Sequence, residues 1–233
     1  MLDPKLKHPW AYLRFESHIS VTKTTSKRFS FFKNGGSGNW DITIEFKWGA
    51  STGSWGNAVL ISQGGNPVRI TRGLVIFQAN RPDPGFYADP TPRDNTEFKQ
   101  YSSYLDDEVL LNRARIFSKA TGDAQGRIDL LRVATHEIGH LLGLSDDYVG
   151  FQSYCGPNPY CPIEITAPRP FAGYIIYLEF GPHVGDPWGD GGLPLMVPDP
   201  PVGERQLISG LDALLIAQLS SFNSPNLGPA PPF

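Results

Sequence analysis

Alternation of apolar and polar residues is the clearest pattern in the N-terminal part of the chain. Residues 40–48 alternate strictly, with two isoleucines, two tryptophans and a phenylalanine on one side. A period of two residues predicts a strand with one buried face. Shorter alternating or apolar runs predict further strands at 17–24, 28–32, 58–61 and 68–78. The N-terminal half is therefore expected to form a sheet.

A period near 3.6 residues predicts helices in the middle and at the end of the chain. Two of them are expected at 106–120 and at about 126–142. Their inward-facing residues would be Val109, Leu110, Ala114 and Phe117 in the first, and Ile128, Leu131, Ala134, Ile138 and Leu142 in the second. The second helix matters most, because it carries the candidate chemistry described below.

A third helix is predicted at 209–219. Ser209 is a suitable N-cap and Asp212 follows three residues later, which is the spacing of a capping interaction. The buried stripe of this helix would consist of Leu211, Leu214, Leu215 and Leu219.

Segments rich in proline, glycine and aspartate separate these elements. Long loops are expected at 80–95 and over most of 144–200, and 224–233 reads as a proline-rich tail. Strands in the first half with helices later in the chain predict an α+β fold. The length of 233 residues suits a single domain, expected over 1–223.

The run from His136 to Asp146, His-Glu-Ile-Gly-His-Leu-Leu-Gly-Leu-Ser-Asp, has the spacing of a catalytic metal site. His136 and His140 are four residues apart, so both lie on one face of the helix and can bind one Zn²⁺ ion. Glu137 lies beside them, where it can act as general base on a metal-activated water. Gly143 can end the helix and turn the chain back, so that Asp146 supplies a third ligand.

Alternatives remain for several of these residues. The motif itself could occur by chance on an ordinary amphipathic helix. Asp147 competes with Asp146 as third ligand, and His183 is a possible substitute that otherwise lies in a solvated loop. Tyr148 would either hydrogen-bond the oxyanion of the reaction or pack beneath the site.

The run His-Glu-Ile-Gly-His-Leu-Leu-Gly-Leu-Ser-Asp-Asp-Tyr at 136–148 resembles the metzincin metallopeptidases. The aspartate version followed by x-Tyr is most similar to the snapalysins, which are small secreted bacterial proteases. The preceding residues 128–135 are similar to the matrixin helix, and metallopeptidase domains of bacterial polymorphic toxins carry a similar run. The strong match covers about twenty residues of the chain.

The resemblance implies two lobes with a substrate cleft between them. The N-terminal lobe, 1–143, would hold a twisted, mostly parallel sheet and the active-site helix, with the strand at 58–61 at the edge above the cleft. The C-terminal lobe, 144–223, would be rich in loops. Met196, in Leu-Met-Val-Pro, would form the methionine turn beneath the metal, although a plain core methionine is the alternative.

Composition and charge limit the partners and the compartment. A net charge of −3 gives no argument for nucleic acid or an anionic membrane, and no segment is apolar enough to cross a bilayer. Cys155 and Cys161 flank a Gly- and Pro-rich loop, which favours a disulfide over metal ligation and indicates an oxidising, extracellular location. Residues 1–5 lack the apolar core of a signal peptide, so a mature form or another export route is expected.

Calcium is a second, weaker cofactor candidate. Asp83, Asp89 and Asp94 lie in the loop 80–95, and the loop 185–192 is also rich in aspartate and glycine. The spacing of a known calcium loop is absent, which favours solvated turn carboxylates and a tight turn.

These observations predict a zinc metalloendopeptidase, acting as a monomer on protein or peptide substrates. Two alternatives are a toxin-type metallopeptidase with one specific protein target and an inactive metal-binding module that recognises protein partners.

Overall fold

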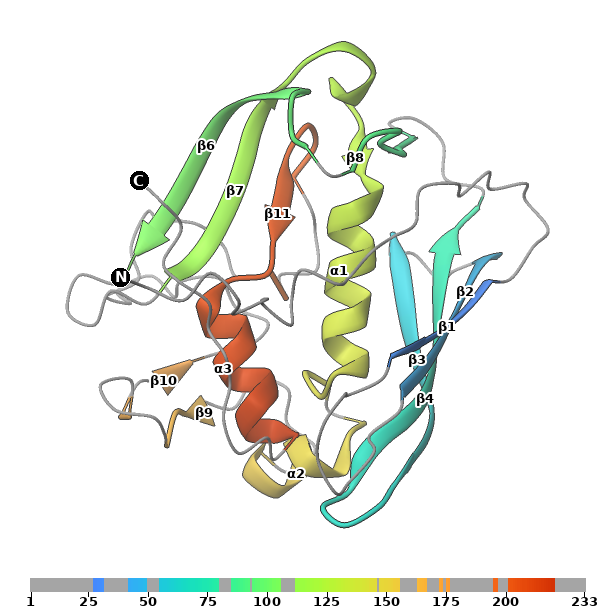
Figure 1. The fold of residues 1–233 in the computed structure, drawn as a ribbon, viewed down its shortest axis with the longest axis vertical. Coiled ribbons are helices and arrows are strands. Elements are labelled where there is room, and N and C mark those ends of the chain that lie inside the picture. The colour runs from blue at the N-terminus through green and yellow to red at the C-terminus, as the bar shows by residue number, and fades with distance from the viewer. Residues whose placement is uncertain are drawn as a thin grey trace, which may run out of the picture.

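The computed structural model describes residues 27–31, 42–49, 55–79, 85–92, 94–105, 112–145, 147–155, 163–166, 172–173, 175–176, 195–196 and 201–220. Helix α1 (Leu130–Leu141) runs through the centre of the molecule (Figure 1). A four-stranded sheet covers one side of this helix. Helix α3 (Gly210–Leu219) and a three-stranded sheet lie on the other side. The described part of the chain is therefore α+β, as the sequence predicts.

The four-stranded sheet contains the strands predicted in the N-terminal half. Its order is β1-β2-β4-β3. The strands are β1 (Lys27–Phe31), β2 (Ile42–Gly49), β3 (Gly56–Gly64) and β4 (Arg69–Gln78). The alternation has the expected effect at the start of β2, because Ile42 and Ile44 are buried while the residues that follow each of them, Thr43 and Glu45, are partly exposed. The strand predicted at 17–24 and Trp40 lie outside the described residues.

The expectation of a mostly parallel sheet is wrong for these strands. β2 and β4 pair in parallel, but β1 pairs antiparallel with β2 and β3 pairs antiparallel with β4. Local connections explain the difference, since a short turn after Gly64 joins β3 to β4 and is too short for a parallel crossover. The register of β3 against β4 also shifts around Ile61, which is the pattern of a β-bulge.

The helix predicted at 106–120 is also wrong. Residues 112–120 form strand β7 (Asn112–Ala120), which pairs antiparallel with β6 (Phe98–Leu105) as a hairpin. A short strand near the C-terminus, β11 (Arg205–Leu207), pairs antiparallel with β7 and completes the three-stranded sheet. The apolar residues of 106–120 fitted a helical period, but pairing with β6 and β11 overrides that local preference.

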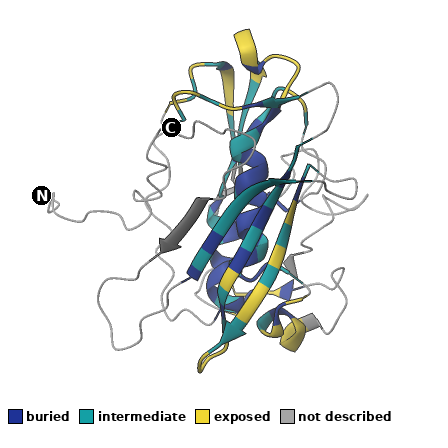
Figure 2. Ribbon diagram, turned by 90° about the vertical axis from the view of Figure 1, so that its right-hand side faces the viewer, coloured by how far each residue is buried: buried dark blue, intermediate teal, exposed yellow. Residues whose placement is uncertain are grey.

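The core lies between α1 and its two neighbouring layers. Val133, Ile138 and Leu141 of α1 are buried together with residues of the four-stranded sheet and of α3. Figure 2 shows α1 as a buried helix behind the partly exposed sheet. Gly73 of β4 allows the close approach, because a Cβ at this position would lie 2.4 Å from the Leu141 side chain.

Helix α3 forms as its sequence predicts. The Ser209 hydroxyl accepts a hydrogen bond from the Asp212 amide at 3.1 Å, and the Asp212 carboxylate accepts one from the Ser209 amide at 2.8 Å. This reciprocal pair is a capping box. The four leucines expected to face inward, Leu211, Leu214, Leu215 and Leu219, are all buried.

Residues 144–223, which the resemblance assigns to a C-terminal lobe, are only partly described. Between α1 and α3 they contain a short helix that the sequence analysis missed, α2 (Val149–Cys155), and the two-residue strands β9 (Ile163–Glu164) and β10 (Ile175–Ile176). Two further two-residue strands, β5 (Phe86–Tyr87) and β8 (Ile128–Asp129), pair in parallel, and β8 directly precedes α1 in the chain. The tail 224–233 lies outside the described residues. Among the residues that are described, no helix is long and apolar enough to span a membrane.

Candidate active site

The two histidines of the motif lie on adjacent turns of α1 and are held in the same way. Their ring centroids are 4.9 Å apart and their planes are nearly perpendicular. Nδ1 of His136 lies 2.8 Å from the carbonyl oxygen of Leu195, and Nδ1 of His140 lies 2.6 Å from that of Leu144. A carbonyl can only accept, so both Nδ1 atoms carry a proton, and in the neutral form of each ring the lone pair is on Nε2. Such outer hydrogen bonds are usual for metal-binding histidines, because they fix the tautomer and the ring orientation.

The end of α1 supplies the partner of His140. Gly143 has a φ of 117°, a conformation that L residues rarely adopt. The Leu144 amide donates to Gly139 O and the Gly143 amide donates to His140 O, both at 3.1 Å, which is the Schellman arrangement. This turn brings the Leu144 carbonyl back to the His140 ring. The predicted helix break at Gly143 is confirmed, and it also orients one of the candidate ligands.

Met196 packs against α1 between the two histidines. A Cβ at Gly139 would lie 2.7 Å from the Met196 sulfur, and Met196 is buried. Its neighbour Leu195 provides the carbonyl that accepts from His136. The segment 195–196 therefore lies against the helix face that carries the motif, where the predicted methionine turn requires it.

Glu137 is buried between α1 and the edge strand β3. Burial raises the pKa of Glu137 to about 7, and a hydrogen bond from the backbone of Ala58 opposes part of that shift. Gly56 makes room for the carboxylate, because a Cβ there would lie 2.6 Å from Glu137 Oε1. A carboxyl group with a pKa near neutrality can both accept and return a proton, which is what a general base requires.

The electrostatics of His136 favour a neutral ring. Burial lowers the pKa of His136 to about 3, with a further contribution from His140. Metal binding requires the neutral imidazole. The protonated Nδ1 atoms of both rings, the neutral form of His136 and the shared helix face therefore fit a divalent metal such as zinc, with His136 and His140 as two of its ligands.

The predicted third ligand, Asp146, lies outside the described residues. Its rival Asp147 is exposed on the turn after α1. Within the described ranges, no group of three His, Cys, Asp or Glu side chains is placed to hold a metal. Asp147 is therefore not grouped with the two histidines, and Asp146 stays a prediction. His183 also lies outside the described residues.

The side chain of Tyr148 is engaged in packing. It is fully buried, and its hydroxyl donates a hydrogen bond to the Val68 carbonyl at 2.7 Å. The ring lies against Gly143 and Gly150, where added Cβ atoms would come within 3.2 and 2.3 Å of it. Of the two roles considered for Tyr148, this placement favours packing beneath the site.

Two other expectations meet the described structure only in part. Cys155 ends helix α2, but Cys161 lies outside the described residues, so the disulfide stays a prediction. Of the calcium candidates, Asp83 is not described and Asp94 is an exposed turn residue, as expected. Asp89 differs from the expected solvated carboxylate, because its side chain is 2% exposed and forms an ion pair with Arg205 at 2.7 Å.

Sequence reasoning missed the groups that orient the motif. The acceptors at Leu195 and Leu144 are backbone carbonyls, which every residue has, so the residue types at these positions do not predict the hydrogen bonds. Gly56 was the one detectable signal, since a glycine at the start of a strand often marks a close approach.

Comparison with protein-family models, with curated proteins and with solved structures finds no match for this chain. The metzincin resemblance therefore rests on the motif and on the geometry of its described residues.

Proposed function

We propose that this protein is a zinc-dependent endopeptidase that hydrolyses peptide bonds with Glu137 as general base. The observation that carries the proposal is the pair of matched histidines on α1. His136 and His140 each donate Nδ1–H to a backbone carbonyl, so that the neutral ring has its lone pair on Nε2, the form that binds a metal. The sequence spacing adds Asp146 as the third ligand.

The residues around the histidines support a catalytic rather than a structural metal. When bound, zinc would polarise the scissile carbonyl and acidify a water molecule. Glu137 takes the proton of the attacking water and hands it to the leaving amine, a role supported by its raised pKa. Met196 backs the helix between the ligands and limits their movement.

The position of β3 supports an extended peptide as substrate. β3 lies at the edge of the four-stranded sheet, and Ala58 of β3 hydrogen-bonds Glu137. An extended peptide can add to such an edge through backbone hydrogen bonds, which would place its scissile bond close to the general base. The substrate is therefore proposed to be a protein or peptide, and the enzyme is proposed to act outside the cell as a monomer.

The test compares the parent with Glu137→Ala, the isosteric Glu137→Gln, and Glu164→Ala as a control at an exposed glutamate on β9. Zinc content is measured by elemental mass spectrometry, and hydrolysis of casein and of quenched peptides is followed with and without a chelator. We expect both Glu137 variants to retain zinc and to lose about 10²–10⁴-fold in kcat. Glu164→Ala should match the parent.

Three outcomes would contradict the proposal. The first is a correctly folded parent that takes up no zinc. The second is a Glu137→Gln variant as active as the parent. The third is a fully zinc-loaded parent that cleaves no general substrate, which would favour the target-specific effector or the inactive binding module.

A further inference from the structure

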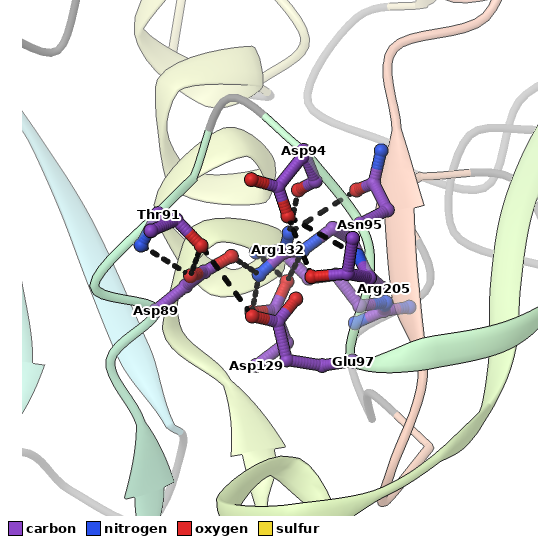
Figure 3. A network of polar contacts seen from close by, with 9 residues as sticks. Asp89, Thr91, Asp94, Asn95, Glu97, Asp129, Arg132 and Arg205 are labelled. Atoms are coloured by element: carbon purple, nitrogen blue, oxygen red, sulfur yellow. Dashed lines mark hydrogen bonds and ion pairs between the residues drawn. The ribbon is translucent and has the colours of Figure 1, made fainter.

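Arg205 on β11 is a fully buried arginine that donates four hydrogen bonds and forms a further ion pair (Figure 3). Nε and Nη2 donate to the two carboxylate oxygens of Asp129, both at 2.9 Å. Nη2 also lies 2.7 Å from Asp89 Oδ2. Nη1 donates to the Asp94 carbonyl at 3.2 Å and to Asn95 Oδ1 at 3.1 Å. A guanidinium has five donors in a fixed planar arrangement, so no other side chain could make this set of bonds.

The main partner of Arg205 is the residue that begins α1. Asp129 is the N-cap, and its Oδ2 accepts a hydrogen bond from the Arg132 amide at 3.1 Å. The next residue of β11, Gln206, accepts a bond from the Arg132 guanidinium at 3.4 Å. Two consecutive residues of β11 therefore hold the first turn of α1.

The same stretch of chain also touches α1 in its middle. Leu195 accepts from His136 and Met196 packs on Gly139, nine residues before β11 begins. His136 follows Asp129 by seven residues, which corresponds to about 10 Å along the helix axis. Residues 195–196 thus contact α1 at the candidate ligands, and residues 205–206 contact it at its start.

We infer that Arg205 is a positioning residue for the proposed zinc site: it fixes the start of α1 relative to the segment that carries Leu195 and Met196. The inference rests on the proposed function only where metal binding is concerned. The contacts of Arg205 given above include none of His136, Glu137 and His140. Arg205 acts through Asp129 and β11 to keep the Leu195 carbonyl at hydrogen-bonding distance from His136 Nδ1.

The chemistry of the contact favours positioning over simple stabilisation. Burying an ion pair costs desolvation energy, so apolar residues of similar volume are often equally stable. What the guanidinium adds is geometry, since its two parallel bonds to Asp129 fix both distance and angle. The Phe98 ring, 4.9 Å from Arg205 Cζ, further restricts the plane of the guanidinium.

The test uses the full chain with Arg205→Lys, which keeps the charge but loses the paired bonds to Asp129, and the milder Asn95→Ala, which removes one of the four hydrogen bonds of Arg205. The control is Ile42→Ala, which opens a cavity in the four-stranded sheet and should lower Tm without touching this network. The tautomer of His136 is read in the metal-free protein from long-range ¹H–¹⁵N spectra. Zinc affinity is measured by competition with a chelating dye, and the Co²⁺-substituted protein gives an absorption spectrum of the site.

We expect Arg205→Lys to weaken zinc binding about 10–100-fold, to alter the Co²⁺ spectrum and to give mixed His136 tautomers. Asn95→Ala should shift the same readouts in the same direction by less, and Ile42→Ala should change Tm alone. The inference is overturned if the Arg205 and Asn95 variants have a lower Tm while the His136 tautomer is the same as in the parent. A parent that binds no zinc would contradict the proposed function, but the tautomer measurement would still decide this inference.

Discussion

Gly139 lies between the two candidate ligands, and the space of its missing side chain is filled by Met196. This arrangement separates two properties of the methionine. Its apolar surface could fill any gap in the core, but its sulfur lies only 2.7 Å from the position that a Cβ on Gly139 would occupy. The contact is therefore specific to this pair of residues, and a single added methyl group tests it.

Gly139→Ala should destabilise the protein by about 1–3 kcal/mol, because the new methyl overlaps the Met196 sulfur in a packed core. Chemical denaturation and zinc titration of the variant measure the effect. Gly85→Ala is a matched control, since a Cβ there meets nothing within 4 Å. A double variant with Met196→Val should recover part of the loss, and strict additivity of the two changes would argue against a direct contact.

For single residues, the sequence predicts which side chains carry the chemistry better than it predicts which groups orient those side chains. His136, Glu137 and Gly143 follow from spacing, because a helix and a positive φ translate directly into positions. The partners of these residues come from distant parts of the chain, such as Leu195 and Gly56. No local pattern encodes such pairings, so they required the structure.

Among the elements, the helices with strong end signals were predicted best. α3 begins at Gly210, directly after the predicted cap Ser209. α1 ends at Leu141, one residue before the predicted end at Leu142. The hairpin of β6 and β7 was missed, because the apolar residues of β7 fit both a helical and a strand period. β11, which also pairs with β7, lies far along the chain. Capping residues near a helix end allow that end to be predicted from the local sequence, whereas a strand depends on pairing partners that the local sequence does not contain.

The capping box of α3 makes stability depend on pH. Burial raises the pKa of Asp212 from 3.8 to about 6, and the hydrogen bonds from Ser209 oppose the shift. Between these values the unfolded chain releases the proton first, so the parent should lose stability as pH rises from about 4 to about 6. In Asp212→Asn, where the amide oxygen can accept the same bonds, this slope should be absent. Urea denaturation of both proteins across the range gives the difference.

Asp94 provides a comparison of opposite sign. Hydrogen bonds from Thr96 hold the pKa of Asp94 below its usual value of 3.8, so this carboxylate favours folding as pH rises through the acid range. The difference between Asp94→Asn and its parent should therefore run in the other direction. A common slope for both variants would mean that the pH effect is not set by the individual carboxylates.

For the whole molecule, α1 is the element that joins all layers. It contacts β3 and β4 on one side and β11 on the other, and it carries both candidate ligands. A metal bound by His136 and His140 would therefore stabilise the central element of the fold. The expected α+β class follows from the order of elements, whereas the mixed direction of the sheet depends on turn lengths that the family resemblance did not reveal.

Zinc should accordingly raise the stability of the entire protein. At a hundredfold excess over its Kd, a ligand adds about 2.7 kcal/mol. For a domain of this size that corresponds to a rise in Tm of about 5–10 °C. Calorimetry with zinc and with a chelator measures it. His136→Gln should abolish the increment and Glu137→Gln should retain it. An equal increment in His136→Gln would place the metal elsewhere.

The register shift at Ile61 has a consequence for how the protein behaves at high concentration. An uncovered sheet edge is a template for any extended chain, including a second copy of the same molecule. In β3 the regular ladder with β4 runs from Gly56 to Leu60 and is then interrupted. A guest strand of a few residues can pair along that stretch, but a long, flat contact between two such edges meets the kink. We therefore expect pairing along β3 to favour short segments over extended self-association.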